Sequence, residues 1–207
     1  MMTLIILIAT TAVLTAVIGV LQSSLSERWI HKFLMHRALW IITHPHYAHE
    51  VIHHGLFKAD ESFELQNHAP EKIKHDRTKI RMAWWNFLII VPVGSIPYAC
   101  VAAPFAFFGL WAVALTIYIT GTCVALAYYF VYEYIHWCMH LPRGRQLELW
   151  PIFQWLLRHH RIHHLLFNKN LNVVLPFADW LFGSLYIENP TLAASRAFRG
   201  AAAQRAR

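Results

Sequence analysis

Two long runs without a charged side chain constrain this sequence more than any other feature. The first is the 19-residue run 3–21, and the second is the 51 residues between Arg81 and Glu133. As helices, the first run can cross a ~30 Å hydrocarbon core once and the second can cross it twice. A cleaved signal peptide is the alternative for 3–21, but no Lys or Arg precedes the run. We predict spans at about 3–21, 83–103 and 107–130, the last two forming a helical hairpin.

The composition agrees with burial in lipid. Charged residues make up 14% of the chain and hydrophobic residues 57%, whereas soluble domains carry about a quarter charged residues. The same values exclude a disordered or collagen-like chain. We therefore predict an all-α integral membrane helical bundle, made of one N-terminal span plus the hairpin, with a histidine-rich helical cap.

The positions of the basic residues predict how the bundle is oriented. All 18 Lys and Arg lie in 28–81 or 143–207. Under the positive-inside rule both segments face the cytoplasm, which places the N-terminus outside. The net charge of +7 then follows from topology and from contact with anionic headgroups, so no nucleic-acid partner is expected. The basic stretch 191–207 is predicted to be a disordered tail.

Histidine is unusually frequent and is confined to two windows on the predicted cytoplasmic side. There are 15, nine within 31–75 and six within 136–164. Most of them fall into four spaced groups: His31 and His36; His49, His53 and His54; His136 and His140; and His160, His163 and His164.

Spacing within these groups indicates metal binding. Side chains three or four residues apart share one face of a helix. His31 and His36 are five apart, so either they serve different metals or the helix ends between them. Ten imidazoles are too many for one zinc ion, which takes four ligands, whereas two metals with about five nitrogens each fit better. Sites rich in nitrogen suit iron, copper, nickel or zinc.

The order and spacing of the histidine groups around a membrane hairpin resemble the fatty acid hydroxylase and sterol desaturase superfamily. The resemblance covers roughly residues 27–187 and implies a single hydroxylase-like domain over 1–190. It implies a cytosolic cap with a non-haem di-iron centre, in which zinc can replace iron in purified protein. It further implies that ten residues are metal ligands: His31, His36, His49, His53, His54, His136, His140, His160, His163 and His164.

The sequence departs from the family pattern in the second group. The family spacing there is HxxHH, and His49 to His53 is one residue longer. His46 could compensate for a displaced His49, and His159 competes with His160. After the last group, Asp179, Trp180, Phe182 and Gly183 match the closing segment of the family, and we interpret these four as structural.

The resemblance implies an enzyme that uses O2 and external electrons to hydroxylate or desaturate a lipid. The segment 61–67, ESFELQN, is partly similar to bacterial carotenoid hydroxylases. A carotenoid and a fatty-acyl, sphingoid or sterol-like lipid are therefore both open as substrates. The sequence has no GxGxxG, no CxxCH and no cysteine set for an iron–sulfur cluster. We therefore expect a separate ferredoxin, cytochrome or reductase as electron donor.

Two other classes of function compete with this interpretation. The stretch His49-Glu50-Val51-Ile52-His53 is an HExxH, the zinc-binding motif of metalloproteases. A membrane zinc protease would leave most of the clustered histidines unexplained, and in a hydroxylase Glu50 would instead accept a histidine N–H. The third class is a metal transporter or non-catalytic metal-binding protein. Transporters place ligands near the bilayer midplane, but residues 83–132 contain no His, Asp or Glu.

Overall fold

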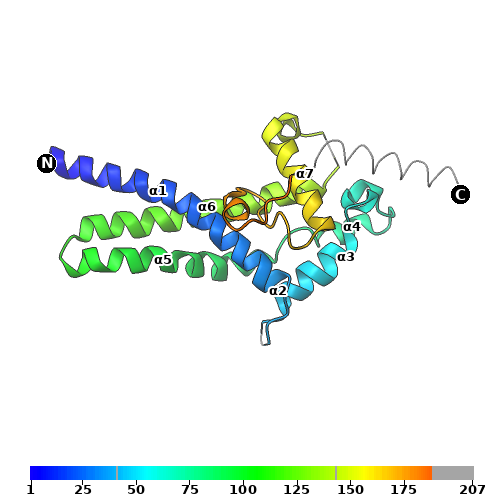
Figure 1. Cartoon of the computed structure of the whole chain (residues 1–207), viewed down its shortest axis with the longest axis horizontal. Coiled ribbons are helices and arrows are strands. Elements are labelled where there is room, and N and C mark those ends of the chain that lie inside the picture. The colour runs from blue at the N-terminus through cyan, green and yellow to red at the C-terminus, as the bar shows by residue number, and fades with distance from the viewer. Residues whose placement is uncertain (41, 143, 188–207) are drawn as a thin grey trace, which may run out of the picture.

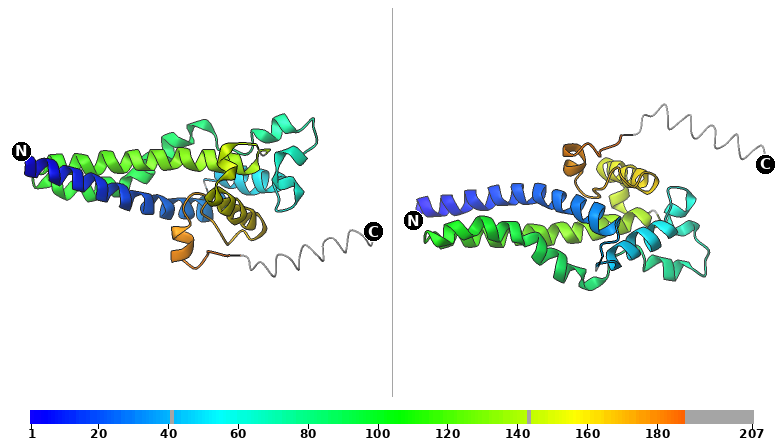
Figure 2. Two further views of the ribbon diagram at one scale, coloured as in Figure 1. Left: turned by 90° about the horizontal axis from the view of Figure 1, so that it is seen from above. Right: turned by 60° about the horizontal axis from the view of Figure 1, so that its bottom comes forward.

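Three long helices form the body of the protein. The computed structural model describes residues 1–40, 42–142 and 144–187, and these residues form helices and one isolated β-bridge between Leu39 and Ile42. The predicted tail at 191–207 lies outside the described residues. The long helices are α1 (Met2–Ile30), α5 (Phe87–Phe107) and α6 (Trp111–His140). They run side by side, and the shorter helices gather at the end away from the N-terminus (Figure 1, Figure 2).

All three helices are long and apolar enough to cross a membrane. Their outer faces carry exposed aliphatic side chains, such as Ile18, Val93 and Ile119. An exposed apolar surface of this extent is unfavourable in water and favourable in lipid. The structure confirms the prediction of an all-helical chain with three candidate spans and a histidine-rich region.

The helix boundaries differ from the predicted ones at the hairpin. Helix α5 begins at Phe87 because Trp84–Asn86 form a short 3-10 helix, η5. The turn of the hairpin lies at 108–110, where Gly109 adopts a φ of 78° that favours glycine. Helix α6 then continues past residue 130 to His140, so that both histidines of the third group, His136 and His140, lie on the extension of the last span.

Close contacts hold the three long helices together. Helix α6 packs against both α1 and α5. The ring of Tyr98 on α5 lies so close to Gly121 on α6 that a Cβ atom there would be 2.3 Å from the ring. The hydroxyl of Tyr98 donates to Gln22 on α1 at 2.7 Å. One tyrosine therefore joins all three helices, and Gly121 is required for the close approach.

Short elements form the cap at the end of the bundle. Helix α1 continues as a π-helix, η1 (His31–Met35). The other elements are α2 (His44–His46), the π-helix η2 (Tyr47–His53), α3 (His54–Leu56), η3 (Glu61–Phe63), η4 (Leu65–Asn67), α4 (Ile73–Arg77), η6 (Gln146–Leu149), α7 (Pro151–Leu165) and α8 (Phe177–Leu181). Helix α7 begins with proline at its first position, where no backbone N–H is needed.

Candidate metal centre

The structure brings the ten predicted histidines together in two groups of five. In each group, one candidate ligand atom from every residue lies within 4.8 Å of all the others. Either group could therefore hold a metal ion. Group 1 contains His31, His36, His49, His54 and His163, and group 2 contains His53, His136, His140, His160 and His164.

Two π-helical turns build most of group 1. A π-helix hydrogen-bonds residue i to i+5, so histidines five apart come to the same face. The backbone N–H of His36 donates to the carbonyl of His31 at 3.1 Å, and the two rings stack with centroids 4.9 Å apart. His49 and His54 are also five apart, across η2, and their Nε2 atoms lie 3.1 Å from each other. The extra residue in the second histidine group is thus accommodated by a π-helix.

Ordinary helical spacing builds most of group 2. His136 and His140 are four apart on α6, and His160 and His164 are four apart on α7. Phe153, Leu156 and Leu157 anchor α7 in the core and so hold these histidines against α6. His163 lies on the same helix but points into group 1. Helical spacing alone would place His160, His163 and His164 on one face of α7, but the structure divides them between the two groups.

Hydrogen bonds on the outer nitrogens orient six of the ten rings. In each case Nδ1 contacts an oxygen, which leaves Nε2 toward the centre of its group. Five of these oxygens are backbone carbonyls. The partners are Leu171 for His31, Glu50 for His36, Lys79 for His53, Phe63 for His140, Lys169 for His163 and Phe57 for His164.

The donor set fits a metal ion. The Nδ1 atoms of His36 and His163 face oxygens, so each neutral ring has its lone pair on Nε2, yet these Nε2 atoms are 3.0 Å apart. Two lone pairs at this distance repel unless a cation lies between them. Nitrogens about 2.1 Å from one metal and at right angles would be about 3.0 Å apart. In group 2, the buried Nε2 atoms of His53 and His136 have no hydrogen-bond partner.

Burial keeps these rings neutral, which is the form that binds metals. Burial, with the nearby His46, lowers the pKa of His36 to about 4. Burial and neighbouring imidazoles hold the pKa values of His160 and His163 well below the ordinary value. The free lone pairs are therefore available at neutral pH without the release of a proton.

The two groups are adjacent. The rings of His54 in group 1 and His164 in group 2 have centroids 4.2 Å apart. His49 and His53 stack at 5.1 Å but fall into different groups. The HExxH pair is therefore divided between two sites, whereas a metalloprotease needs both histidines on one zinc. The carboxylate of Glu50 accepts from Nδ1 of His36, so Glu50 is the partner of a histidine N–H.

The remaining cap histidines lie outside both groups. His159 is buried, and its Nε2 lies 3.3 Å from Asp179, so His160 rather than His159 joins His164 in group 2. His68 and His75 both contact Asp76. His44 stacks on Trp85, and His46, although near, is not needed to compensate for His49.

A buried carboxylate holds the C-terminal segment against α1. Asp179 accepts hydrogen bonds from the backbone N–H of Leu171 and of Asn172 and from the Ser184 hydroxyl. Burial alone would raise the pKa of Asp179, but these bonds and that from His159 outweigh it and lower the pKa. The guanidinium of Arg28 lies 3.9 Å away. Asp179 thereby fixes the segment whose Leu171 carbonyl orients His31, consistent with the predicted structural role.

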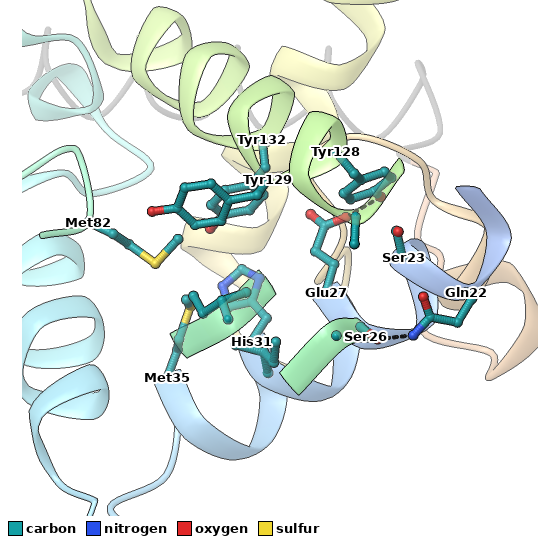
Figure 3. Close-up of a pocket in the computed structure, with 14 residues that line it drawn as sticks. Gln22, Ser23, Ser26, Glu27, His31, Met35, Met82, Tyr128, Tyr129 and Tyr132 are labelled. Carbon is teal, nitrogen blue, oxygen red and sulfur yellow. Dashed lines mark hydrogen bonds between the residues drawn. The ribbon is translucent and has the colours of Figure 1, made fainter. Parts of the chain in front are cut away.

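An apolar pocket reaches group 1 from between the long helices (Figure 3). Figure 3 shows His31, Met35 and Met82 gathered at one end with Tyr132. Two pairs of polar side chains in its wall bond to each other: Gln22 donates to Ser26 at 2.8 Å, and Tyr128 donates to Glu27 at 2.6 Å. Ile90, Gly94 and Ala125 line the part that lies between the spans.

A second pocket opens on the other side of the same wall. Met35, Met82 and Tyr132 line both pockets. The second pocket is also lined by three of the candidate ligands, His49, His53 and His136, and by the basic residues Lys79 and Arg81. Group 1 therefore borders the apolar pocket, and both groups border the second, more polar pocket.

No protein-family model matches the sequence, and no curated protein or solved structure is significantly similar to it. The family resemblance therefore depends on the spacing of the histidines and on the closing segment.

Proposed function

We propose that this protein is a membrane-bound, O2-dependent oxygenase that hydroxylates or desaturates a lipid, with two iron ions held by groups 1 and 2. The observation that carries the proposal is the pair of adjacent five-histidine groups beside an apolar pocket between candidate spans. Iron bound there would supply the reduction of O2 and the cleavage of an unactivated C–H bond. The overall hydroxylation consumes O2, two electrons and two protons, and yields the alcohol and water.

The chain itself supports this chemistry by positioning the imidazole ligands and by excluding water from the pocket. Buried carbonyls and Glu50 fix the imidazole rings, so the donor atoms need no reorganisation when metal binds. The apolar wall from Ile90 to Met35 suits an alkyl chain and offers few groups that could hold water. Lipid would enter this pocket directly from the bilayer.

We also propose that the cap and the C-terminus face the cytoplasm and that the N-terminus lies outside. Every Lys and Arg lies in 28–81 or 143–207, and the positive-inside rule places such basic segments in the cytoplasm. Electrons then come from a cytoplasmic donor.

The activity is tested with iron-loaded protein in lipid vesicles. Membrane lipids, a reducing system and ¹⁸O2 are supplied, and the lipids are analysed by mass spectrometry. We expect an alcohol that carries ¹⁸O, or a product that lacks two hydrogens, formed only when O2 and reductant are both present. Hydrolysis of a peptide in the absence of O2, with no oxidised lipid, would contradict the proposal.

Gly94 provides a test of the apolar pocket. It lines the pocket, and a Cβ added to it meets no atom within 4 Å. Gly94→Leu should therefore fit the helix while filling the space, because leucine also favours a helix more than glycine does. We expect turnover of long-chain lipid to fall roughly 10-fold or more, with metal content unchanged. Val93→Leu, on the exposed face of the same helix, is the matched control. Equal turnover by both variants would show that lipid does not use this pocket.

A further inference from the structure

Phe167 connects group 1 to the protein surface. It follows the end of α7 and is 43% exposed. Its ring lies 4.9 Å from that of His54 and 5.8 Å from that of His36, measured between centroids. All five residues of group 2 are buried, whereas His36 of group 1 is only partly buried. Group 1 is therefore the side of the metal centre nearer to solvent.

The neighbours of Phe167 form an exposed apolar ridge. Leu165 is 55% exposed and Leu166 is 39% exposed. We call residues 165–167 the 165–167 ridge. Exposed apolar residues that are grouped in this way, rather than scattered, mark surfaces for protein interaction. Because the ridge leads out of α7 directly after two candidate ligands, His163 and His164, any protein seated on it would lie next to the metal centre.

Basic residues lie close to the ridge along the chain, or near His36, whose ring contacts Phe167. Lys32 and Arg37 lie on either side of His36 in the sequence, and both side chains lie over the ring of Phe33. Lys169 follows Phe167 by two residues, and its backbone carbonyl accepts from His163. The acidic Glu50 is also close, but it is paired with His36. An apolar centre with a basic rim is complementary to a partner with an acidic rim.

We infer that the 165–167 ridge is the docking surface for a small acidic one-electron carrier protein, and that Phe167 is the residue through which electrons reach group 1. The inference rests on the proposed function, because an oxygenase without its own redox motif needs such a partner. In each encounter the carrier loses one electron and the metal centre gains it, so two encounters supply one turnover. Phe167 offers such a route, because this exposed aromatic ring contacts the rings of three histidines of group 1, His36, His54 and His163.

Binding is measured with the full chain in detergent and with two acidic probes, a plant-type [2Fe–2S] ferredoxin and the soluble domain of cytochrome b5. Leu165 is 55% exposed and is not one of the ten candidate ligands, so Leu165→Asp should leave the metal groups intact and weaken probe binding about 10-fold or more. Ile152→Asp is the matched control, because Ile152 is equally exposed on α7 and lies about 20 Å away along the helix. Arg37→Glu should also weaken binding, and should make it less sensitive to salt.

Electron transfer is measured separately by stopped flow. We expect Phe167→Leu to retain most of the binding but to slow reduction by the probe about 10-fold, whereas Leu165→Asp should be reduced by dithionite at the normal rate. The inference is overturned if neither probe binds the wild-type chain, or if both Leu165→Asp and Arg37→Glu bind like wild type. If the protein holds metal and is reduced by dithionite, but neither probe binds it or reduces it, the docking surface alone is refuted. A chain that binds no metal refutes the proposed function instead.

Discussion

Replacing His140 with alanine is expected to abolish the oxygenase activity. His140 is fully buried in group 2, and its Nε2 lies 3.2 Å from that of His160. Its loss removes one of the five donors of group 2 and leaves a cavity in its place. We expect oxidised lipid to fall below detection in the ¹⁸O2 assay.

Glu50→Gln is the informative counterpart of His140→Ala. Glutamine retains an oxygen that can accept from Nδ1 of His36, so an oxygenase should lose at most about 10- to 100-fold in metal affinity. A protease that used Glu50 as general base would lose about 10²- to 10⁴-fold in rate and would tolerate His140→Ala. Activity that survives His140→Ala but not Glu50→Gln would therefore contradict the proposed function.

Asp179→Ala is expected to be the most destabilising single change in the cap. It removes the only carboxylate that the described residues place beside the buried guanidinium of Arg28, which then keeps the Ser184 hydroxyl as its acceptor. It also removes the acceptor for two backbone N–H groups of the C-terminal segment. Breaking a buried ion pair in this way costs about 3–5 kcal/mol. For a chain of this size that corresponds to a fall in melting temperature of roughly 6–20 °C.

The measurement is thermal unfolding in detergent, together with metal content. Asp60→Ala is the control, because Asp60 is a far less buried aspartate that caps a short 3-10 helix, and its loss should cost only about 1 kcal/mol. Because the Leu171 carbonyl orients His31, Asp179→Ala should also weaken metal binding at group 1. Equal melting temperatures for the two variants would show that the contacts of Asp179 do not hold the cap together.

The sequence was sufficient to predict the helical class, the three candidate spans and the set of histidines that come together. Charge-free length identifies a span without tertiary information, and spacing on a helix face identifies side chains that point the same way. His136 and His140, four apart on the continuation of α6, are the clearest example. His160 rather than His159 completes the HxxHH pattern of the resemblance, and the structure places His159 against Asp179.

The division of the histidines between two groups could not be predicted. It depends on two π-helical turns, which bring His31 to His36 and His49 to His54, and periodicity based on 3.6 residues does not reveal them. The carbonyls that orient the histidine rings could not be predicted either. Every residue has a backbone carbonyl, so the sequence does not indicate that those of Leu171 and Phe63 contact histidines. Phe167 was missed because a single aromatic residue after a histidine group has no distinctive spacing.

The most direct test of the two-metal centre is the metal content per chain. Protein is purified in mild detergent from cells supplied with iron, and metals are quantified against protein for the wild type and for His140→Ala. The account predicts close to two metal ions per chain, as iron or as zinc in its place, and a clear loss of metal in the variant, because the ten histidines form two groups of five. One zinc ion per chain, unaffected by His140→Ala, would contradict it and would point to the HExxH site alone.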